Sequence, residues 1–103
     1  MKTVTLCGSM KFADEMKDIA LQLEISHDMN VIQCIYNSHG VHLSDDDMKQ
    51  IVEAHYKKIE LSDAIYVVDI DGYMGESVKK EIEFAESKGK EVIYHTVFMK
   101  CMN

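Results

Sequence analysis

The sequence lacks any long apolar run. No stretch of its 103 residues approaches the roughly 20 apolar residues that a membrane-spanning helix needs, and its first residues show no hydrophobic region of a signal peptide. The sequence also lacks a disulfide framework, since Cys7, Cys34 and Cys101 are odd in number and form no C-x-x-C motif. We therefore expect a protein of the reducing cytoplasm that does not associate with membranes.

An excess of basic residues is absent too. The formal net charge is −7 at pH 7, which argues against binding a nucleic-acid polymer, because phosphate backbones require a basic surface. A single small nucleotide is not excluded. The glycine-rich motif of dinucleotide-binding folds and the lysine loop of NTP hydrolases are both missing, so these classes are disfavoured and no cofactor is expected.

One histidine pair invites a metal interpretation. His39 and His42 lie shortly before three consecutive aspartates at residues 45–47, but no further ligand pattern accompanies them. Aspartates in a first helical turn favour the positive end of the helix dipole, and Ser44 with Asp47 resembles a capping box. The sequence therefore predicts a solvated loop followed by an acidic helix start, with no metal ion.

Apolar strand patterns alternate with helical patterns along the whole chain. Strands are predicted at residues 3–7, 31–36, 64–68 and 91–94, the last one continuing as far as residue 99 in one interpretation. Amphipathic helices are predicted at residues 11–25, 44–61 and 77–88. We expect one domain covering residues 1–103, an α/β three-layer sandwich of flavodoxin-like or Rossmann-like type. Its four-stranded parallel sheet should have the order 2-1-3-4.

The chain after the third strand is the strongest site candidate. Residues 64–68 are apolar without alternation, which is typical of a strand covered on both faces. Asp69 and Asp71 follow it, and then come Gly75 and Ser77 at the start of the next helix. Ligands of open α/β sheets bind beside such strand ends and helix N-termini.

Glu81 occupies a distinctive place on this next helix. Val78, Ile82 and Ala85 form its apolar stripe, and Glu81 lies at the stripe's edge, one turn after Ser77. We expect the Glu81 carboxylate to be partly shielded and still directed toward the strand ends.

Two further positions have both a structural and a functional interpretation. The turn Gly8-Ser9-Met10 joins a strand to a helix, where it could bind an anion or simply contain Ser9 as an N-cap. His55 belongs to the apolar face of the helix at residues 44–61, where a histidine is usually a core or rim residue satisfied by a hydrogen bond.

Two segments resemble the nucleoside 2-deoxyribosyltransferase family and its 2′-deoxynucleoside 5′-phosphate N-hydrolase relatives. The segment at residues 77–85 is similar to the one that carries the family's nucleophilic glutamate, which falls on Glu81, and residues 6–11 are similar to a Cys-Gly-Ser turn of the N-hydrolases. The resemblance departs at His55, where relatives commonly have an acid/base aspartate, and at three residues of the second segment and its approach, namely Gly75, Ser77 and Glu83.

The resemblance implies cleavage or transfer at the N-glycosidic bond of a nucleoside or nucleoside monophosphate. It implies Glu81 as nucleophile, His55 as proton donor and Asp69 as an orienting group, with substrate contacts from Cys7, Gly8, Ser9, Met10, Lys11, Asp71, Gly75 and Ser77. It also implies a homodimer or larger homo-oligomer, for which residues 56, 59 and 97–99 offer apolar surface. The alternatives are a non-catalytic protein that senses a nucleotide in the same crevice, and a purely structural interaction domain.

Overall fold

Strands and helices alternate along the chain in the computed structural model, which describes residues 1–101. The strands are β1 (Lys2–Gly8), β2 (Met29–Ile32), β3 (Ala64–Val68) and β4 (Glu91–Tyr94). The helices are α1 (Ala13–Ser26), α2 (Asp45–Leu61), α3 (Glu76–Ser87) and α4 (His95–Cys101), with short 3₁₀ helices η1 (Met10–Phe12) and η2 (Ile70–Gly72). None of the helices within residues 1–101 is both long enough and apolar enough to cross a membrane.

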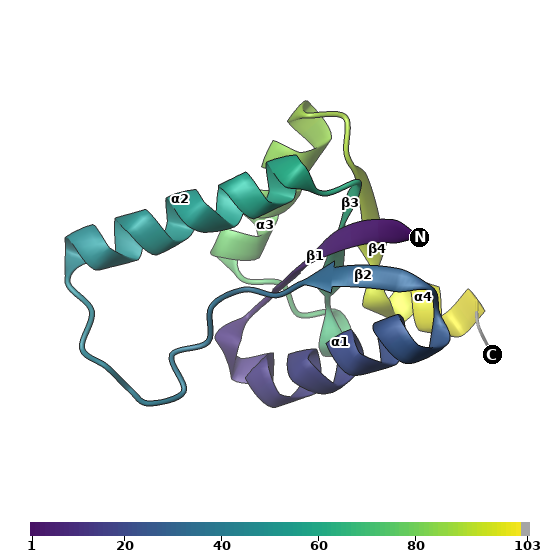
Figure 1. Ribbon diagram of the computed structural model, residues 1–103, viewed down its shortest axis with the longest axis horizontal. Coiled ribbons are helices and arrows are strands. Elements are labelled where there is room, and N and C mark those ends of the chain that lie inside the picture. The colour runs from purple at the N-terminus through teal and green to yellow at the C-terminus, as the bar shows by residue number, and fades with distance from the viewer. Residues whose placement is uncertain (102–103) are drawn as a thin grey trace.

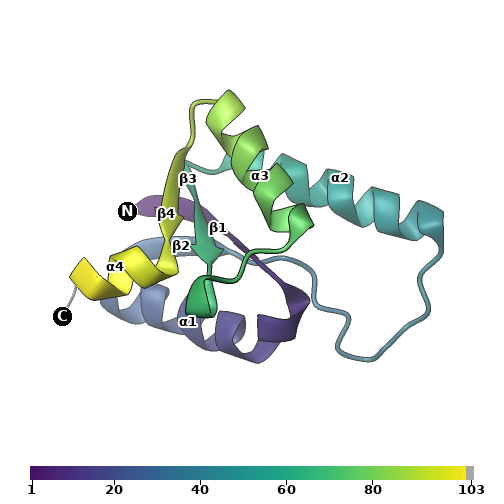
Figure 2. The ribbon, with the colours of Figure 1, turned by 180° about the vertical axis from the view of Figure 1, so that it is seen from behind.

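The four strands form one parallel sheet in the order β2-β1-β3-β4 (Figure 1). Helices α1 and α4 cover one face, and α2 and α3 cover the other, as the view from behind also shows (Figure 2). The predicted α/β sandwich and its strand order are thereby confirmed.

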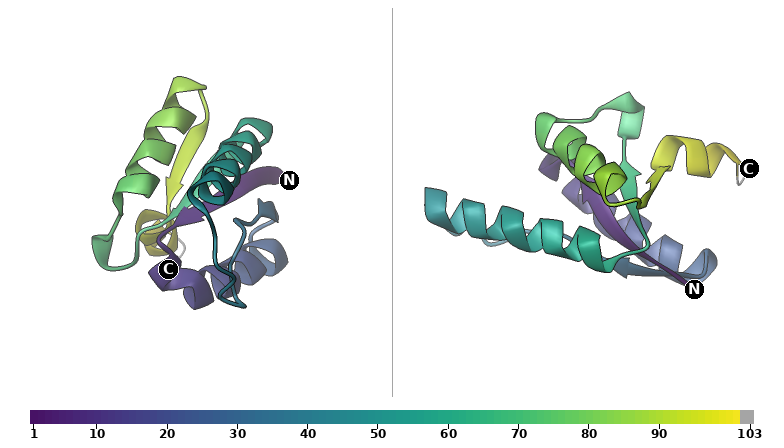
Figure 3. Two further views of the ribbon diagram at one scale, coloured as in Figure 1. Left: turned by 90° about the vertical axis from the view of Figure 1, so that its left-hand side faces the viewer. Right: turned by 90° about the horizontal axis from the view of Figure 1, so that it is seen from above.

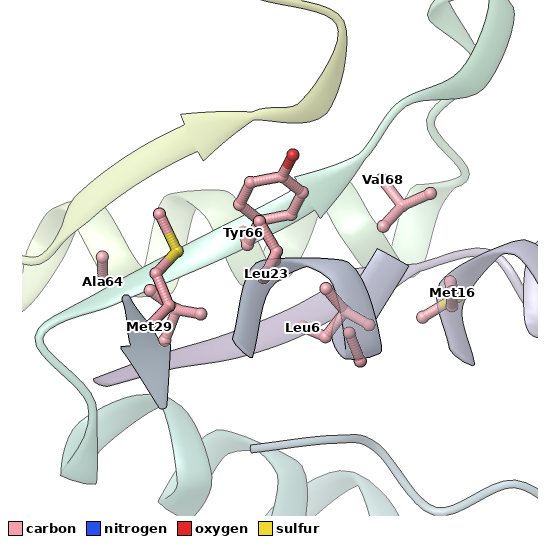
Figure 4. Packing of buried hydrophobic residues seen from close by; sticks show 9 residues of the cluster. Leu6, Met16, Leu23, Met29, Ala64, Tyr66 and Val68 are labelled. Carbon is pink, nitrogen blue, oxygen red and sulfur yellow. The ribbon is translucent and has the colours of Figure 1, made fainter. Parts of the chain in front are cut away.

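Side chains alternate between two cores because successive residues of a strand point to opposite faces. Leu6, Tyr66 and Val68 pack toward α1 and α4 together with Met16 and other buried residues (Figure 4). The residues between them pack toward α2 and α3, with Cys7, Ile59, Ile65, Val67, Val78, Ile82 and Ala85 forming that second core. All five residues of β3 are buried, which explains why its sequence is apolar without alternation.

Helix α2 begins at the predicted place. The Ser44 side chain accepts a hydrogen bond from the Asp47 backbone N–H, and the Asp47 carboxylate accepts one from the Ser44 backbone N–H, both at 3.0 Å. This capped end of the helix lies beyond the sheet, together with the segment that precedes it (Figures 1 and 3). Ile59 is the one buried residue of α2, so most of the helix is held at its C-terminal end.

The ends of two strands bear on how far apolar sequence can be taken as strand. β2 ends at Ile32 rather than at residue 36, because beyond that point the chain leaves the sheet edge while Cys34 and Tyr36 still pack against the core. β4 has the predicted bounds Glu91–Tyr94, and the extension to residue 99 considered in one interpretation is wrong, because the chain forms α4 there. In both places an apolar sequence reflects burial outside the sheet.

Asp69 anchors α4 to the end of β3. Its carboxylate is almost fully buried, and it accepts hydrogen bonds from the Thr96 backbone N–H at 2.9 Å and from the Thr96 hydroxyl at 2.8 Å. Nearby, the Tyr66 hydroxyl lies 2.7 Å from His95 Nδ1, and the Phe98 ring packs edge-on against Tyr66. Asp69 therefore acts as a side-chain cap for the first turn of α4.

We predict that Asp69→Ala destabilises the protein by about 2 kcal/mol, because two hydrogen bonds to a charged acceptor are lost. Urea unfolding followed by circular dichroism measures this. Thr96→Val is the matched comparison: it removes only the hydroxyl bond and should cost about half as much. Equal stability of Asp69→Ala and the wild-type protein would contradict the capping role.

Candidate active site

A cleft of about 580 Å³ opens at the carboxyl end of β1, between α2 and the start of α3. This volume is within the range of small-molecule sites. The cleft wall comes from the β1–η1 turn, the segment after β2, the exposed face of α2 and the first turns of α3. Its lining includes Gly8, Ser9, Met10, Cys34, Ile35, Met48, Ile51, Val52, His55, Tyr56, Gly75, Ser77 and Glu81.

Glu81 lies at the wall of this cleft with a side chain only 15% exposed. The burial of Val78, Ile82 and Ala85 against the sheet fixes the rotation of α3, and Glu81 consequently occupies the edge between the buried and exposed faces. This is the partly shielded position that the helical pattern predicts.

His55 reaches Glu81 from the opposite wall. Its Nε2 atom lies 3.1 Å from Glu81 Oε1, and its side chain is 13% exposed. A carboxylate only accepts hydrogen bonds, so Nε2–H is the donor. His55 Nδ1 is buried and has no hydrogen-bond partner within residues 1–101. Within the described residues, His55 is therefore held through Nε2, and its other ring nitrogen is left unsatisfied.

Cys7 completes the cluster from the sheet side. Its Sγ atom lies 3.5 Å from the same His55 Nε2. Burial raises the pKa of the Cys7 thiol well above its ordinary value, and the charge of Glu81 raises it further, so the sulfur stays protonated. A nucleophile–histidine–carboxylate relay uses both ring nitrogens, whereas here both partners share one. The cluster is thus not a cysteine-hydrolase triad.

The rim of the cleft carries the groups predicted to bind an anion. Gly75 is the N-cap of α3 and offers no side-chain hydrogen bond, which leaves the first backbone N–H groups of that helix without a cap. Ser9 and Ser77 line the same cleft. Ser9 also accepts a hydrogen bond from the Lys11 backbone N–H at 3.3 Å, so it is an N-cap as one interpretation expects, and its binding of an anion stays a prediction.

Gly8 has a packing reason of its own. A Cβ atom there would lie 3.0 Å from Met16 Sδ and 3.2 Å from Val68 Cβ, too close for any larger residue without rearrangement. The absence of a side chain at Gly8 is thus explained by packing on the α1 side of the sheet, independently of the cleft.

Four predicted site residues do not line the cleft: Cys7, which is buried on the sheet side of the cluster, and three charged residues. Asp69 is engaged by Thr96 on the α4 side of the sheet. Asp71 is exposed in η2 with a left-handed backbone (φ 56°). The Lys11 ammonium lies 3.3 Å above the ring of Tyr73. The structure thus brings Glu81, His55 and Cys7 together with the glycine and serine turns, and leaves these three charged residues elsewhere.

Sequence reasoning did not assign the apolar wall of the cleft. Met48, Ile51 and Val52 line it from α2, although Met48 and Val52 remain about half exposed (46% and 47%). The signal was the length of the apolar face, which continues from Met48 to Ile59 although only Ile59 is buried.

Neither a protein-family model nor a curated protein matches the chain. Among solved structures, the chain is similar to a CMP N-glycosidase, BcmB, from Clostridium botulinum, with a TM-score of 0.59 and 22% sequence identity. The similarity covers 90% of this chain and 70% of that chain. At this identity the comparison establishes the fold, the parallel β2-β1-β3-β4 sheet with helices on both faces.

Proposed function

We propose that this protein cleaves or transfers the N-glycosidic bond of a nucleoside or nucleoside monophosphate. The observation that carries the proposal is a shielded carboxylate, Glu81, in hydrogen-bond contact with His55 at the wall of a nucleotide-sized cleft. The fold it shares with an enzyme described as a CMP N-glycosidase supports the choice of substrate class.

Glu81 is the nucleophile in this proposal. Positive charge develops on the anomeric carbon as the bond to the base breaks, and a neighbouring carboxylate stabilises it or forms a covalent ester with it. The protonated form of His55 gives its Nε2 proton to the leaving base. Water, or a second base, then attacks the anomeric carbon, releases Glu81 and returns a proton to His55. The apolar wall of α2 would receive the flat face of the base.

We predict that Glu81→Gln lowers base release from CMP or another nucleotide by on the order of 10⁴-fold, because the amide keeps the shape of glutamate but is a poor nucleophile. Chromatographic detection of free base across a panel of nucleosides and nucleotides measures this. Glu83→Gln, on the exposed face of the same helix, is the matched control and should retain full turnover. Near-normal turnover in Glu81→Gln would refute the nucleophile assignment.

A 5′-phosphate is proposed to bind at the uncapped start of α3. Gly75, Ser77 and Ser9 line the cleft at the start of this helix, where the uncapped N–H groups and the helix dipole favour an anion. Lys11 would join only by leaving the Tyr73 ring, so we assign the main contribution to the backbone.

Gly75→Asp tests this phosphate site. Gly75 has φ −76° and ψ 171°, and an added Cβ meets nothing closer than 3.8 Å, so a side chain fits there. The new carboxylate would cap the N–H groups and repel a phosphate. We predict that wild type binds a monophosphate more tightly than its nucleoside in calorimetry, and that Gly75→Asp abolishes this preference.

Gly75→Asn separates the two effects of that substitution. It offers a neutral cap of nearly the same shape and should weaken monophosphate binding less than the aspartate does. Equal affinity of wild type for nucleoside and monophosphate would contradict the phosphate role.

A second copy of the chain is proposed to close the cleft. The outer part of α2 extends beyond the sheet (Figure 3), and Met48 and Val52 are exposed on it, while Ile35 of the segment after β2 is exposed at the same cleft. Three of the residues expected from sequence to be surface are not available: Ile59 is buried, Tyr56 packs on Phe84 and Phe98 packs on Tyr66. The pairing surface is therefore assigned to the outer half of α2.

We predict a dimer mass in light scattering at micromolar concentration and a monomer mass for Val52→Asp, because a charge would be buried in the apolar interface. Glu53→Asp, at the next position of the helix, serves as the control and should stay dimeric. A clean monomer mass for wild type, unchanged by added CMP, would overturn the shared-cleft proposal.

Non-catalytic nucleotide binding is the second candidate function. The observation in its favour is the 3.1 Å contact between His55 and Glu81, since the two catalytic carboxyl groups of a retaining glycosidase are about 5–5.5 Å apart, leaving space for the sugar. A catalytic substrate would have to separate the two groups. Saturable CMP binding with no base released after prolonged incubation is the result that this alternative expects.

A further inference from the structure

Three metal-ligating side chains converge where the proposed chemistry uses only two. Cys7 Sγ, His55 Nε2 and a Glu81 carboxylate oxygen all lie within 4.8 Å of one another. They come from β1, α2 and α3, so no motif of closely spaced ligands in the sequence predicts a metal site here. Within residues 1–101 this is the one group of three or more histidine, cysteine and acidic side chains close enough to share an ion, and it does not include His39 or His42.

The observed distances suit a tetrahedral zinc site. With Zn–S near 2.3 Å and Zn–N and Zn–O near 2.1 Å, tetrahedral angles put the nitrogen about 3.6 Å from the sulfur and about 3.4 Å from the oxygen. The observed separations are 3.5 Å for Sγ to Nε2 and 3.1 Å for Nε2 to Oε1. The third separation, Sγ to the carboxylate oxygen, is within 4.8 Å, against about 3.6 Å in a tetrahedral site, so an ion between the three atoms requires these two side chains to approach each other.

We propose that Cys7, His55 and Glu81 form a Zn²⁺-binding site with three protein ligands. A thiolate with an imidazole and a carboxylate selects zinc over the oxygen-binding ions Mg²⁺ and Ca²⁺. On binding, the thiol proton leaves to solvent, and the single proton of the neutral imidazole is transferred from Nε2 to Nδ1, which frees the Nε2 lone pair for the metal. Because His55 and Glu81 line the cleft, the fourth coordination position faces the cleft and takes water or a ligand atom.

Zinc and the proposed glycosidic chemistry exclude each other. The ion would bind the carboxylate oxygen that attacks the sugar and the imidazole nitrogen that protonates the base. Zn²⁺ is thus an inhibitor of the proposed activity. This consequence rests on the proposed function, whereas metal binding itself does not.

Competition against a chromophoric chelator tests the site directly. The full chain, stripped of metal by dialysis against a chelator, should take up one Zn²⁺ per chain. Because loss of an outer-shell partner of a metal site already costs 10–100-fold in affinity, Cys7→Ala, which removes a direct ligand, should raise the zinc Kd by at least about 100-fold. Cys101→Ser, at an exposed thiol, is the matched control and should bind as wild type does.

Cobalt substitution supplies a readout that does not depend on affinity. Co²⁺-loaded wild type should show a thiolate-to-cobalt charge-transfer band in the near ultraviolet, and Cys7→Ala should lack it. Glu81→Gln keeps the thiol and should retain the band with weaker binding. A band in this variant and none in Cys7→Ala assigns the band to the Cys7 sulfur and not to a general effect of altering the cluster. Circular dichroism of each variant reports on folding.

Two results would overturn the inference: failure of wild type to compete with the chelator, or a loss of affinity in Cys101→Ser as large as that in Cys7→Ala. Inhibition of base release by Zn²⁺, reversed by EDTA, supports the consequence for activity. Zinc binding in a protein that releases no base from any nucleotide would leave the metal site intact and count against the glycosidic function alone.

Discussion

Strand β3 has no solvent-facing side, since all five of its residues are buried between helix layers. A buried parallel strand requires helices on both faces of the sheet. The crossover connections that supply them make all the strands run in one direction, so that all their carboxyl ends lie at the same edge of the sheet. The carboxyl ends of β1 and β3 and the start of α3 are consequently neighbours. The cleft lies at this edge because the sheet places the backbone turns there, whatever side chains those turns carry.

This arrangement also determines how strongly the Glu81 carboxylate is shielded from solvent. Cys7 is part of the buried core facing α2 and α3, and Glu81 projects from the edge of the helix that packs on it. A carboxylate so shielded needs a partner, and the one that the fold supplies is His55 from the opposite wall. The short distance between His55 Nε2 and Glu81 Oε1 suits a proton donor, a pair of zinc ligands and a simple structural hydrogen bond alike. Chemistry at Glu81 therefore depends on how readily His55 moves away.

Much of the fold could be predicted because its signals are local. The apolar run of β3, the stripe of Val78, Ile82 and Ala85, and the capping box of Ser44 and Asp47 each depend on neighbouring residues, and each is found as predicted. Glu81 follows from the stripe by helical geometry. These features required no knowledge of distant contacts.

The features that were not predicted depend on contacts between residues distant in sequence, which a local sequence pattern does not reveal. Asp69 follows a strand end as a ligand-binding aspartate would, but Thr96, which is distant in sequence, takes both of its oxygens. Lys11 is near the expected turn and is instead drawn onto the Tyr73 ring. The apolar tail is compatible with a strand in sequence, whereas in the structure it forms α4 and Phe98 packs edge-on against the distant Tyr66.

The position of α2 has a thermodynamic consequence for any ligand. In a single copy of the chain, its first turns are joined to the body mainly through Ile59 and the residues around it, so the outer half behaves much like an isolated helix, which is marginal in water below about 12–15 residues. One wall of the cleft can thus unwind locally at far lower free energy than the sheet can unfold. A ligand that contacts Met48 and Val52 must order this part of α2 when it binds. The conformational entropy lost makes the free energy of binding less favourable.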